Sequence, residues 1–279
     1  MRITLTALTL GVVLATGIPA QDEGPNLSTK FGIGTTTQYF YRGIQQENGG
    51  FIVQPEIGIG GVVHESDDAV SQVHWEMGLW NSLHEGNTGT SGGAQTMWYE
   101  SRFYLGVGAS LPSNVDASMR YVVRSSPNGV FSTTEELQFL AEWDDSDRWE
   151  DSDIGGLHPS VELSFELSGG SDAGADLGTY LGLSATPSYV LDEFITVKAP
   201  ITFGFSLGDY YENAGGADDT FGFLSLGLMG EMTEVLPPEY GPWVLTGGLE
   251  LLFLGDNAET INTGDPFEAI LSVGMMLHW

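Results

Sequence analysis

The sequence predicts an all-β fold: a transmembrane antiparallel up-and-down β-barrel of about 12 strands. Two observations carry this prediction. Segments in which apolar and polar residues alternate recur along the chain, separated by clusters of Gly, Asp, Asn and Ser. The last of these segments, 267–279, is longer than the usual strand of a soluble protein and ends the chain on Trp279.

The C-terminal segment has one continuous apolar face. Phe267, Leu271, Val273, Leu277 and Trp279 share that face, and the interleaved residues are mostly small or polar. A strand of about a dozen residues suits a tilted bilayer-spanning strand of about 9–11 residues. It resembles the closing strand of bacterial outer-membrane barrels, which implies the barrel-assembly machinery as a partner that reads Trp279. The alternative is the closing strand of a soluble sandwich.

The first 20 residues have the features of a secretory signal peptide. Arg2 is followed by an apolar stretch from Ile3 to Ala15 and by Ile18-Pro19-Ala20, a plausible cleavage site. The expected organisation is therefore a signal peptide at 1–20 and one barrel domain at 21–279. The chain has no cysteine, so neither disulfides nor thiolate metal sites stabilise it.

The exported chain is strongly acidic. Removal of Arg2 with the signal peptide leaves 7 Lys+Arg against 38 Asp+Glu, a formal charge of −31. Nucleic acid is disfavoured as a partner because phosphate binding needs a basic face. Adaptation to high salt and a surface that attracts cations both remain open.

Twelve alternating segments can be counted in chain order, and an even number is typical of bacterial single-chain barrels. They are 30–44, 51–63, 70–83, 96–109, 116–124, 135–143, 160–168, 177–189, 193–207, 220–232, 243–254 and 267–279. Longer polar connections alternate with short ones, as expected of outer loops and periplasmic turns. The connection 144–157 is long where a short one is expected, so it is either an unusual turn or a sign that the count is off by one strand.

The alternation assigns a face to each side chain. Large apolar residues are expected to face lipid: Trp75, Phe103, Phe139, Phe165, Phe203 and Trp279. The opposite face carries the expected pore-lining residues, Arg42, Glu56, Glu76, Glu100, Arg102, Arg120, Arg124, Glu136, Glu142, Glu162, Glu166 and Lys198. They fit a pore with weak cation preference, or ion pairs that brace or plug a narrow lumen.

Catalytic and metal chemistry have weaker signals. Outer-membrane phospholipases use a Ser/His pair on the lipid-facing surface, and no histidine of this chain falls on that face, so an outer-membrane hydrolase is the least favoured alternative. Acidic residues in the loop 144–153 could bind Ca²⁺, although no EF-hand spacing is present and a solvated loop is the simpler interpretation. No cofactor is expected.

The N-terminal third resembles the TorF family of bacterial porins. The first hairpin contains the run Thr35–Gln46, TTTQYFYRGIQQ, followed by Pro55-Glu56, and is similar to that family's first two strands. Gly78-Leu79-Trp80-Asn81-Ser82 and Trp98-Tyr99-Glu100 are similar to its third and fourth strands. The resemblance implies an outer-membrane barrel without cofactor and assigns no catalytic residues. The expected function is passive diffusion of small solutes or ions through the bacterial outer membrane, and the alternative is a plugged structural or ligand-binding barrel.

Overall fold

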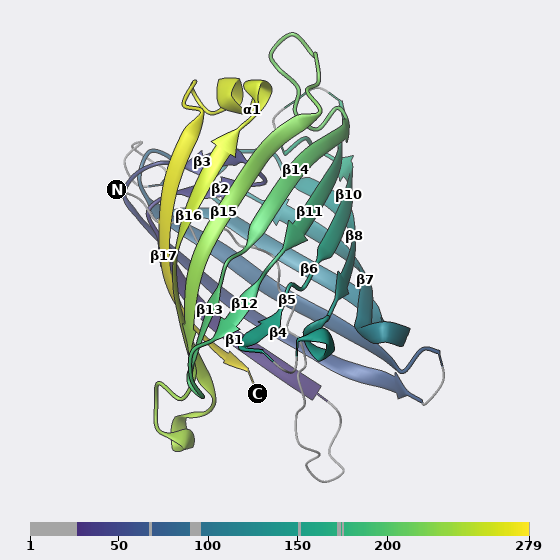
Figure 1. The fold of residues 1–279 in the computed structure, drawn as a ribbon. Helices are drawn as coiled ribbons and strands as arrows, with labels where there is room; N and C mark the ends of the chain where they lie inside the picture. The colour runs from purple at the N-terminus through teal and green to yellow at the C-terminus, as the bar shows by residue number, and fades with distance from the viewer. Residues whose placement is uncertain are drawn as a thin grey trace.

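The chain forms a closed ring of antiparallel strands in the computed structural model, which describes residues 27–66, 69–89, 96–149, 152–171, 174 and 176–278 (Figure 1). The ring strands are β1 (Leu27–Thr36), β4 (Phe51–Glu65), β5 (Gln72–Glu85), β6 (Trp98–Leu111), β7 (Val115–Ser125), β8 (Thr134–Trp143), β10 (Ser160–Ser168), β11 (Thr179–Ala185), β14 (Ile201–Gly208), β15 (Phe221–Met232), β16 (Trp243–Leu254) and β17 (Phe267–His278). Strand β17 pairs with β1, and β14 pairs with β15, which closes the ring.

The predicted all-β class and the count of twelve barrel strands are confirmed. Closure leaves no ring strand with an unpaired edge, which is the arrangement that hydrocarbon requires of a sheet. Residues 1–20 and Trp279 lie outside the described residues, so the signal peptide and the last residue of the closing strand remain predictions.

The two ends of the barrel differ. One end, called the loop end here, carries the hairpin of β2 (Tyr39–Tyr41) and β3 (Ile44–Glu47), together with α1 (Asp256–Ile261). The opposite end, called the turn end, carries the 3-10 turns η2 (Pro112–Asn114), η3 (Ser146–Arg148) and η4 (Pro238–Tyr240). Among the described residues, no helix is long and apolar enough to cross a membrane.

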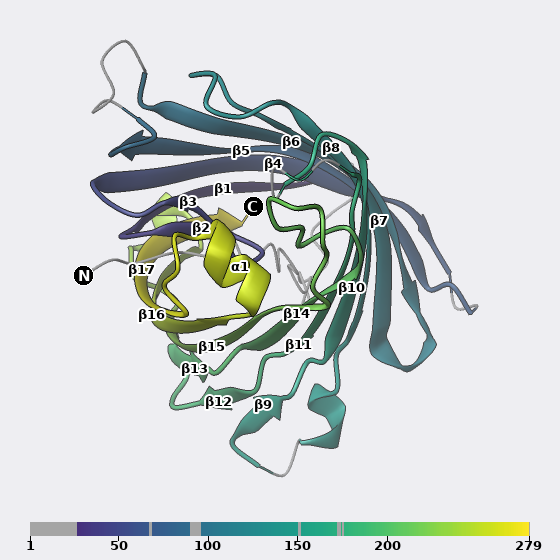
Figure 2. The same cartoon turned by 90° about the horizontal axis from the view of Figure 1, so that it is seen from above.

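The anomalous connection 144–157 proves to be an unusual turn. It contains η3 and the short strand β9 (Ile154–Gly156), which pairs with β12 (Ser188–Val190), itself paired with β13 (Ile195–Lys198). These three strands prolong β10, β11 and β14 beyond Pro159, Pro187 and Pro200, residues that cannot donate a ladder hydrogen bond. Seen down the barrel, β9, β12 and β13 project outward from the ring (Figure 2).

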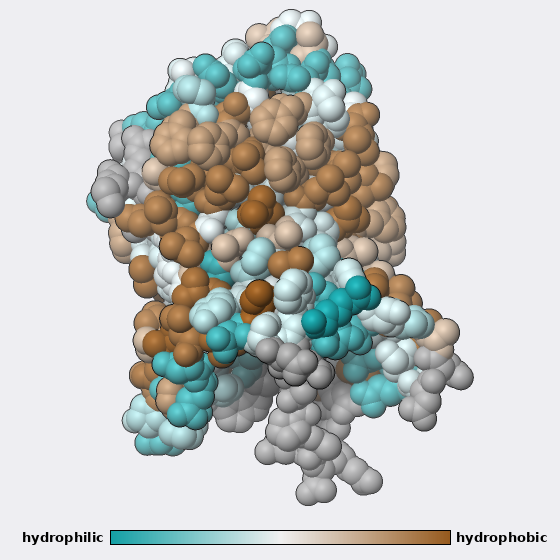
Figure 3. Space-filling view, in the orientation of Figure 1, coloured by the Kyte–Doolittle hydropathy of each residue, from teal (hydrophilic) through white to brown (hydrophobic). Residues whose placement is uncertain are grey.

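The outer face is apolar. Phe103, Phe139, Phe165 and Phe203 keep 36–40% of their surface exposed. Figure 3 shows a band of hydrophobic side chains across the face of the barrel that it displays. Ring contacts such as Phe139–Phe165 and Phe253–Phe267 extend across neighbouring strands of this band. The outward assignment of these four phenylalanines from the alternation is therefore correct.

The first predicted strand, 30–44, is wrong in its second half. Strand β1 ends at Thr36, and the chain then turns into the β2–β3 hairpin. Continued alternation from Phe31 would place Tyr39 and Tyr41 on the outer face, but they are 0% and 4% exposed inside the barrel. The physical reason is a change of path: the bend after Thr36 takes the chain off the wall, so the strand parity no longer applies.

Candidate functional site

The candidate site is the lumen at the level of the β2–β3 hairpin. The turn of the hairpin is Arg42-Gly43, with φ angles of 48° and 80°. Such angles are unfavourable for most side chains but readily adopted by glycine, so Gly43 allows the tight reversal. Arg42, which was expected on the wall of the first strand, instead lies at the hairpin tip.

The hairpin tip reaches the far wall of the barrel. Arg42 Nη2 lies 2.6 Å from Glu162 Oε1 on β10 and 3.0 Å from Glu136 Oε2 on β8. Its Nη1 donates to the Tyr210 hydroxyl at 3.0 Å. Because the hairpin starts from β1 and β4, these contacts tie opposite sides of the ring together.

Backbone groups of the turn are also held. The Tyr211 hydroxyl donates to Arg42 O at 2.9 Å, and Asn262 Nδ2 donates to Gly43 O at 2.6 Å. The Gln45 N–H in turn donates to Asn262 Oδ1 at 2.7 Å. Asn262 directly follows α1, so the helix at the loop end contributes a clamp that local periodicity does not indicate.

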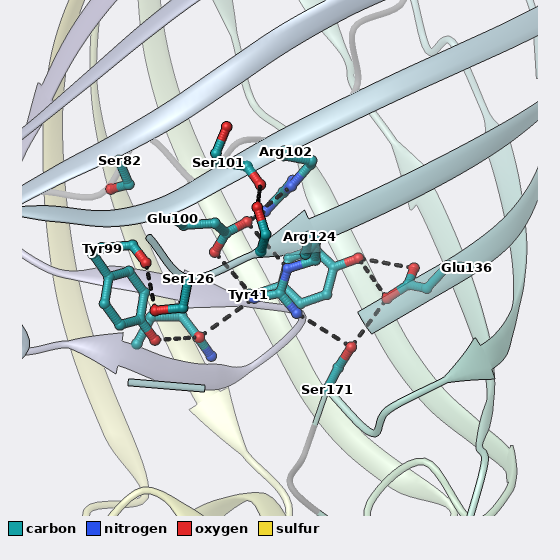
Figure 4. A network of polar contacts seen from close by, with 12 residues as sticks. Tyr41, Ser82, Tyr99, Glu100, Ser101, Arg102, Arg124, Ser126, Glu136 and Ser171 are labelled. Carbon is teal, nitrogen blue, oxygen red and sulfur yellow. Dashed lines mark hydrogen bonds and ion pairs between the residues drawn. The ribbon is translucent and has the colours of Figure 1, made fainter. Parts of the chain in front are cut away.

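Buried tyrosine, arginine and glutamate side chains of the hairpin and of the wall form one group, named the hairpin network: Tyr39, Tyr41, Arg42, Glu100, Arg102, Arg124 and Glu136. Figure 4 shows its members Tyr41, Glu100, Arg102, Arg124 and Glu136. Glu100 is its centre. Arg102 Nη2 lies 2.8 Å from Glu100 Oε1, and Arg124 donates through Nε and Nη2, each at 3.1 Å, to the two oxygens of Glu100. The Tyr39 hydroxyl donates to Glu100 at 3.0 Å and accepts from Arg102 at 2.7 Å.

Tyr41 occupies the middle of the hairpin network. Its hydroxyl donates to both oxygens of Glu136 at 2.9 and 3.0 Å. The guanidinium carbons of Arg124, Arg102 and Arg42 lie 3.8, 4.7 and 4.9 Å from the centre of its ring. A desolvated guanidinium over an aromatic face is attracted by the ring quadrupole, so Tyr41 helps to hold three positive charges near one another.

The base of the hairpin is anchored by a second chain of hydrogen bonds. Ser82 Oγ lies 2.7 Å from His84 Nε2, and His84 Nδ1 lies 2.6 Å from Thr88 Oγ1. Thr88 donates its hydroxyl and its N–H to Glu47 Oε2 at 2.5 and 2.9 Å. Burial opposes the ionisation of Glu47, but the hydrogen bonds from Thr88, Asn48 and Gly49 prevail and lower its pKa from the ordinary 4.5.

Apolar packing completes the hairpin contacts. On one side Phe40 and Ile44 pack with Phe223, Leu252 and Ile270 of β15, β16 and β17. On the other side Tyr39 and Tyr41 pack with Ile52, Trp80 and Tyr99. Tyr99 was assigned outward with Phe103, but it is 4% exposed inside because the register shifts between Ser82 and Leu83, opposite the start of β6.

Between the hairpin network and the turn end, the wall carries simpler ion pairs, named the turn-side pairs. These are Lys30–Glu56 at 2.6 Å, Arg120–Glu76 at 2.5 Å and Lys198–Glu231 at 2.9 Å. Their carboxylate side chains are 19–27% exposed, so water reaches them. The Tyr104 hydroxyl donates to Glu56 at 3.1 Å, and its ring lies in space left by Gly58 and Gly78.

The twelve residues predicted to line a pore fall into different surroundings, and that they line a pore stays a prediction. The structure brings Arg42, Glu100, Arg102, Arg124, Glu136 and Glu162 together at the hairpin and leaves Glu56, Glu76, Arg120 and Lys198 in turn-side pairs. Glu166 accepts the N–H groups of Ser171 and Gly178, and Glu142 stands apart from all of these contacts. Arg42 lies inside because the hairpin carries it there and not because of strand parity, and the parity rule missed the tyrosines that organise the arginines.

The acidic loop 144–153 does not assemble a metal site among its described residues. Asp145 accepts the N–H groups of Leu157 and His158 and the indole N–H of Trp149. Its carboxylate thus stabilises the turn that precedes β10. In the described part of the chain no group of three or more His, Asp or Glu side chains could hold a metal ion.

No protein-family model matches the chain, and no curated protein is similar to it. Solved structures that are similar include the NanC porin, with 10% identity over 90% of this chain and 98% of that chain and a TM-score of 0.45. Two others are the translocator domain of the autotransporter NalP from Neisseria meningitidis (11%, 92% and 89%, TM-score 0.41) and the outer-membrane channel DcaP of Acinetobacter baumannii (9%, 91% and 96%, TM-score 0.37).

At these TM-scores the likeness carries no functional argument, and the barrel assignment depends on the strand pairing of this chain. The class supported by that pairing is a closed antiparallel barrel of twelve ring strands. The resemblance to the TorF family has no family match to support it and stays a prediction.

Proposed function

We propose that this protein is a bacterial outer-membrane channel for small solutes or ions, narrowed by its own β2–β3 hairpin. The observation that carries the proposal is the pairing of a closed ring with an apolar outside and a charged inside. A lipid-facing band excludes water from the outer surface, while turn-side pairs with 19–27% exposed carboxylates keep the interior wet. A polar lumen inside an apolar shell is the arrangement of a diffusion channel.

The proposed orientation follows from the connections. Short periplasmic turns and longer extracellular loops are typical of such barrels. We therefore place the turn end, with η2 and η4, at the periplasm and the loop end, with the hairpin and α1, outside the cell. The closing strand β17 would then present its last residues, up to Trp279, to the barrel-assembly machinery in the periplasm.

The burial of the hairpin network favours a second candidate, a barrel plugged at rest. Glu100 and Glu136 are 0% exposed and Arg124 is 2% exposed, so ions do not pass in contact with them while the hairpin is seated. A hydrolase is not supported, because Ser82 and His84 are each 0% exposed beneath the same hairpin. The two non-enzymatic candidates differ in whether current flows before the hairpin moves.

Single-channel recording in planar bilayers tests the proposal. Wild-type protein should give stepwise conductance, and Arg42→Ala should raise its size or frequency because the hairpin tip loses Glu136, Glu162 and Tyr210. Arg148→Ala removes the same charge from the exposed turn η3 and serves as the control. Current only in Arg42→Ala would indicate a resting plug, and silence in all three proteins would overturn the channel.

A further inference from the structure

The charges of the lumen balance almost everywhere. Six inward bases pair with six carboxylates: Lys30, Arg42, Arg102, Arg120, Arg124 and Lys198 with Glu56, Glu76, Glu100, Glu136, Glu162 and Glu231. Pairs of opposite charge a few ångströms apart leave little net field at the distance of a passing ion. The hairpin network is rich in arginine, but because its charges are paired it contributes little net electrostatic potential at the position of a permeating solute.

Most of the remaining inward carboxylates accept hydrogen bonds from neutral polar donors, which stabilise their charge. Glu47 accepts from Thr88, Asn48 and Gly49, and Glu166 accepts from the N–H groups of Ser171 and Gly178. Glu268 accepts from the side-chain amides of Gln38 and Gln45, and Glu250 from the Ser225 hydroxyl. All four lie in the half of the barrel nearer the loop end.

Glu142 is the exception. It faces the lumen near the end of β8, at the turn end, and is 5% exposed, yet its Oε2 has no hydrogen-bond partner. Its cross-strand neighbour on β7 is another carboxylate, Asp116, whose side chain is 39% exposed. Directly opposed residues in an antiparallel pair have Cβ atoms about 4.5–5.5 Å apart, so the two carboxylates share one patch of wall.

Nearby bases do not compensate this pair. His74 Nε2 lies 3.8 Å from Asp116, beyond hydrogen-bond distance, and Lys198 is engaged by Glu231 at 2.9 Å. Asp116 accepts one hydrogen bond, from the Ser110 hydroxyl at 3.1 Å. A buried carboxylate without a donor beside a second carboxylate is costly unless a cation stands near it.

We infer that Glu142 and Asp116 form the charged ring segment that sets cation preference at the turn end of the channel, and that its ligands are monovalent inorganic cations or the ammonium group of a small solute. This inference deepens the proposed function and rests on it. When both groups are ionised, their two negative charges on a low-dielectric wall concentrate cations at the mouth they line. The described residues offer no cluster for a tightly held metal, which fits transient attraction during passage.

The test is the reversal potential of reconstituted full-length protein across a KCl gradient. In Glu142→Gln, the ratio of cation to anion permeability should fall by about two- to fivefold, the size of one Coulomb interaction across a few ångströms of water. Asp116→Asn should have the same direction and supplies a second, more exposed variant. Glu268→Gln removes an equal charge from the half of the barrel nearer the loop end, away from the Glu142–Asp116 pair, and should change the ratio less.

The outcomes distinguish a failure of the Glu142–Asp116 inference from a failure of the proposed channel. Conducting channels in which neither Glu142→Gln nor Asp116→Asn changes the ratio more than Glu268→Gln does would overturn the inference and leave the channel intact. A Glu142 that carries a proton would make Glu142→Gln alone ineffective, and that result would overturn the role given to Glu142. Protein that stays silent even with Arg42→Ala would overturn the channel itself. The difference between variants should also shrink in molar salt, where the Debye length is about 3 Å.

Discussion

The hairpin network and the turn-side pairs contain the same residue types in different surroundings. Glu100 and Glu136 are 0% exposed and each accepts hydrogen bonds from several donors, whereas the turn-side carboxylates are 19–27% exposed and mostly meet one base. In the dry region, each charge depends on its partners because water cannot replace them. The difference shows that depth in the barrel decides whether a Glu–Arg pair braces the fold or lines a wet wall.

The largest expected loss of stability comes from a substitution at Glu100, the centre of the hairpin network. Glu100→Gln leaves Arg102 and Arg124 without their shared charge, and removal of one partner of a buried pair costs about 3–5 kcal/mol. Glu56→Gln, in a turn-side pair with Lys30, should cost below about 1 kcal/mol. Urea unfolding of the detergent-folded barrels measures both, and equal losses would contradict the contrast between the two regions.

The comparison of the hairpin network with the turn-side pairs assumes that lipid surrounds the barrel outside both. A charged side chain introduced on the outer face tests this assumption. Phe203 is 40% exposed on the outer face of β14, and Phe203→Arg should lower the free energy of unfolding in bilayers by about 2–4 kcal/mol near the midplane. Phe203→Leu keeps the site apolar and is the control. An arginine variant as stable as that control would show that this face does not meet hydrocarbon.

Two glycines of the barrel wall are expected to differ in their tolerance of substitution by alanine. A Cβ at Gly78 would overlap the Tyr104 ring and hydroxyl, so Gly78→Ala should push Tyr104 from Glu56 and destabilise by about 1–3 kcal/mol. At Gly230 the nearest atom to such a Cβ is Gly247 O at 4.0 Å. Gly230→Ala should therefore stay within about 0.5 kcal/mol of wild type in the same urea titration.

The smallest expected effect is acid sensitivity at the base of the hairpin. Because the folded-state pKa of Glu47 lies below the ordinary 4.5, its stabilisation is fully present above pH 4.5 and is lost as the pH falls through the lowered value. Urea midpoints measured between about pH 6 and pH 3 should fall less in Glu47→Gln than in wild type. Glu65→Gln, at an exposed position on β4, is the control and should follow wild type.

Sequence patterns predicted most of the barrel wall and little of the β2–β3 hairpin, which crosses the lumen. Alternation placed Phe103, Phe139 and Phe165 outside and Arg120 inside because strand geometry sends successive side chains to opposite faces. The same rule failed at Tyr39 and Tyr41, where the strand ends and a hairpin begins. Gly43, next to the end of the predicted strand, is a local signal of that turn.

The sequence by itself determined the fold class, the strand count and the outward position of the phenylalanines on the wall, since each follows from a period of two residues in the local backbone. Only the tertiary structure decided which side chains contact one another across the lumen. Arg42 pairs with Glu162, 120 residues away, and Tyr41 bonds to Glu136, 95 residues away. No local period encodes contacts between residues so far apart in the sequence, because these contacts form only when the ring closes and the hairpin folds into it.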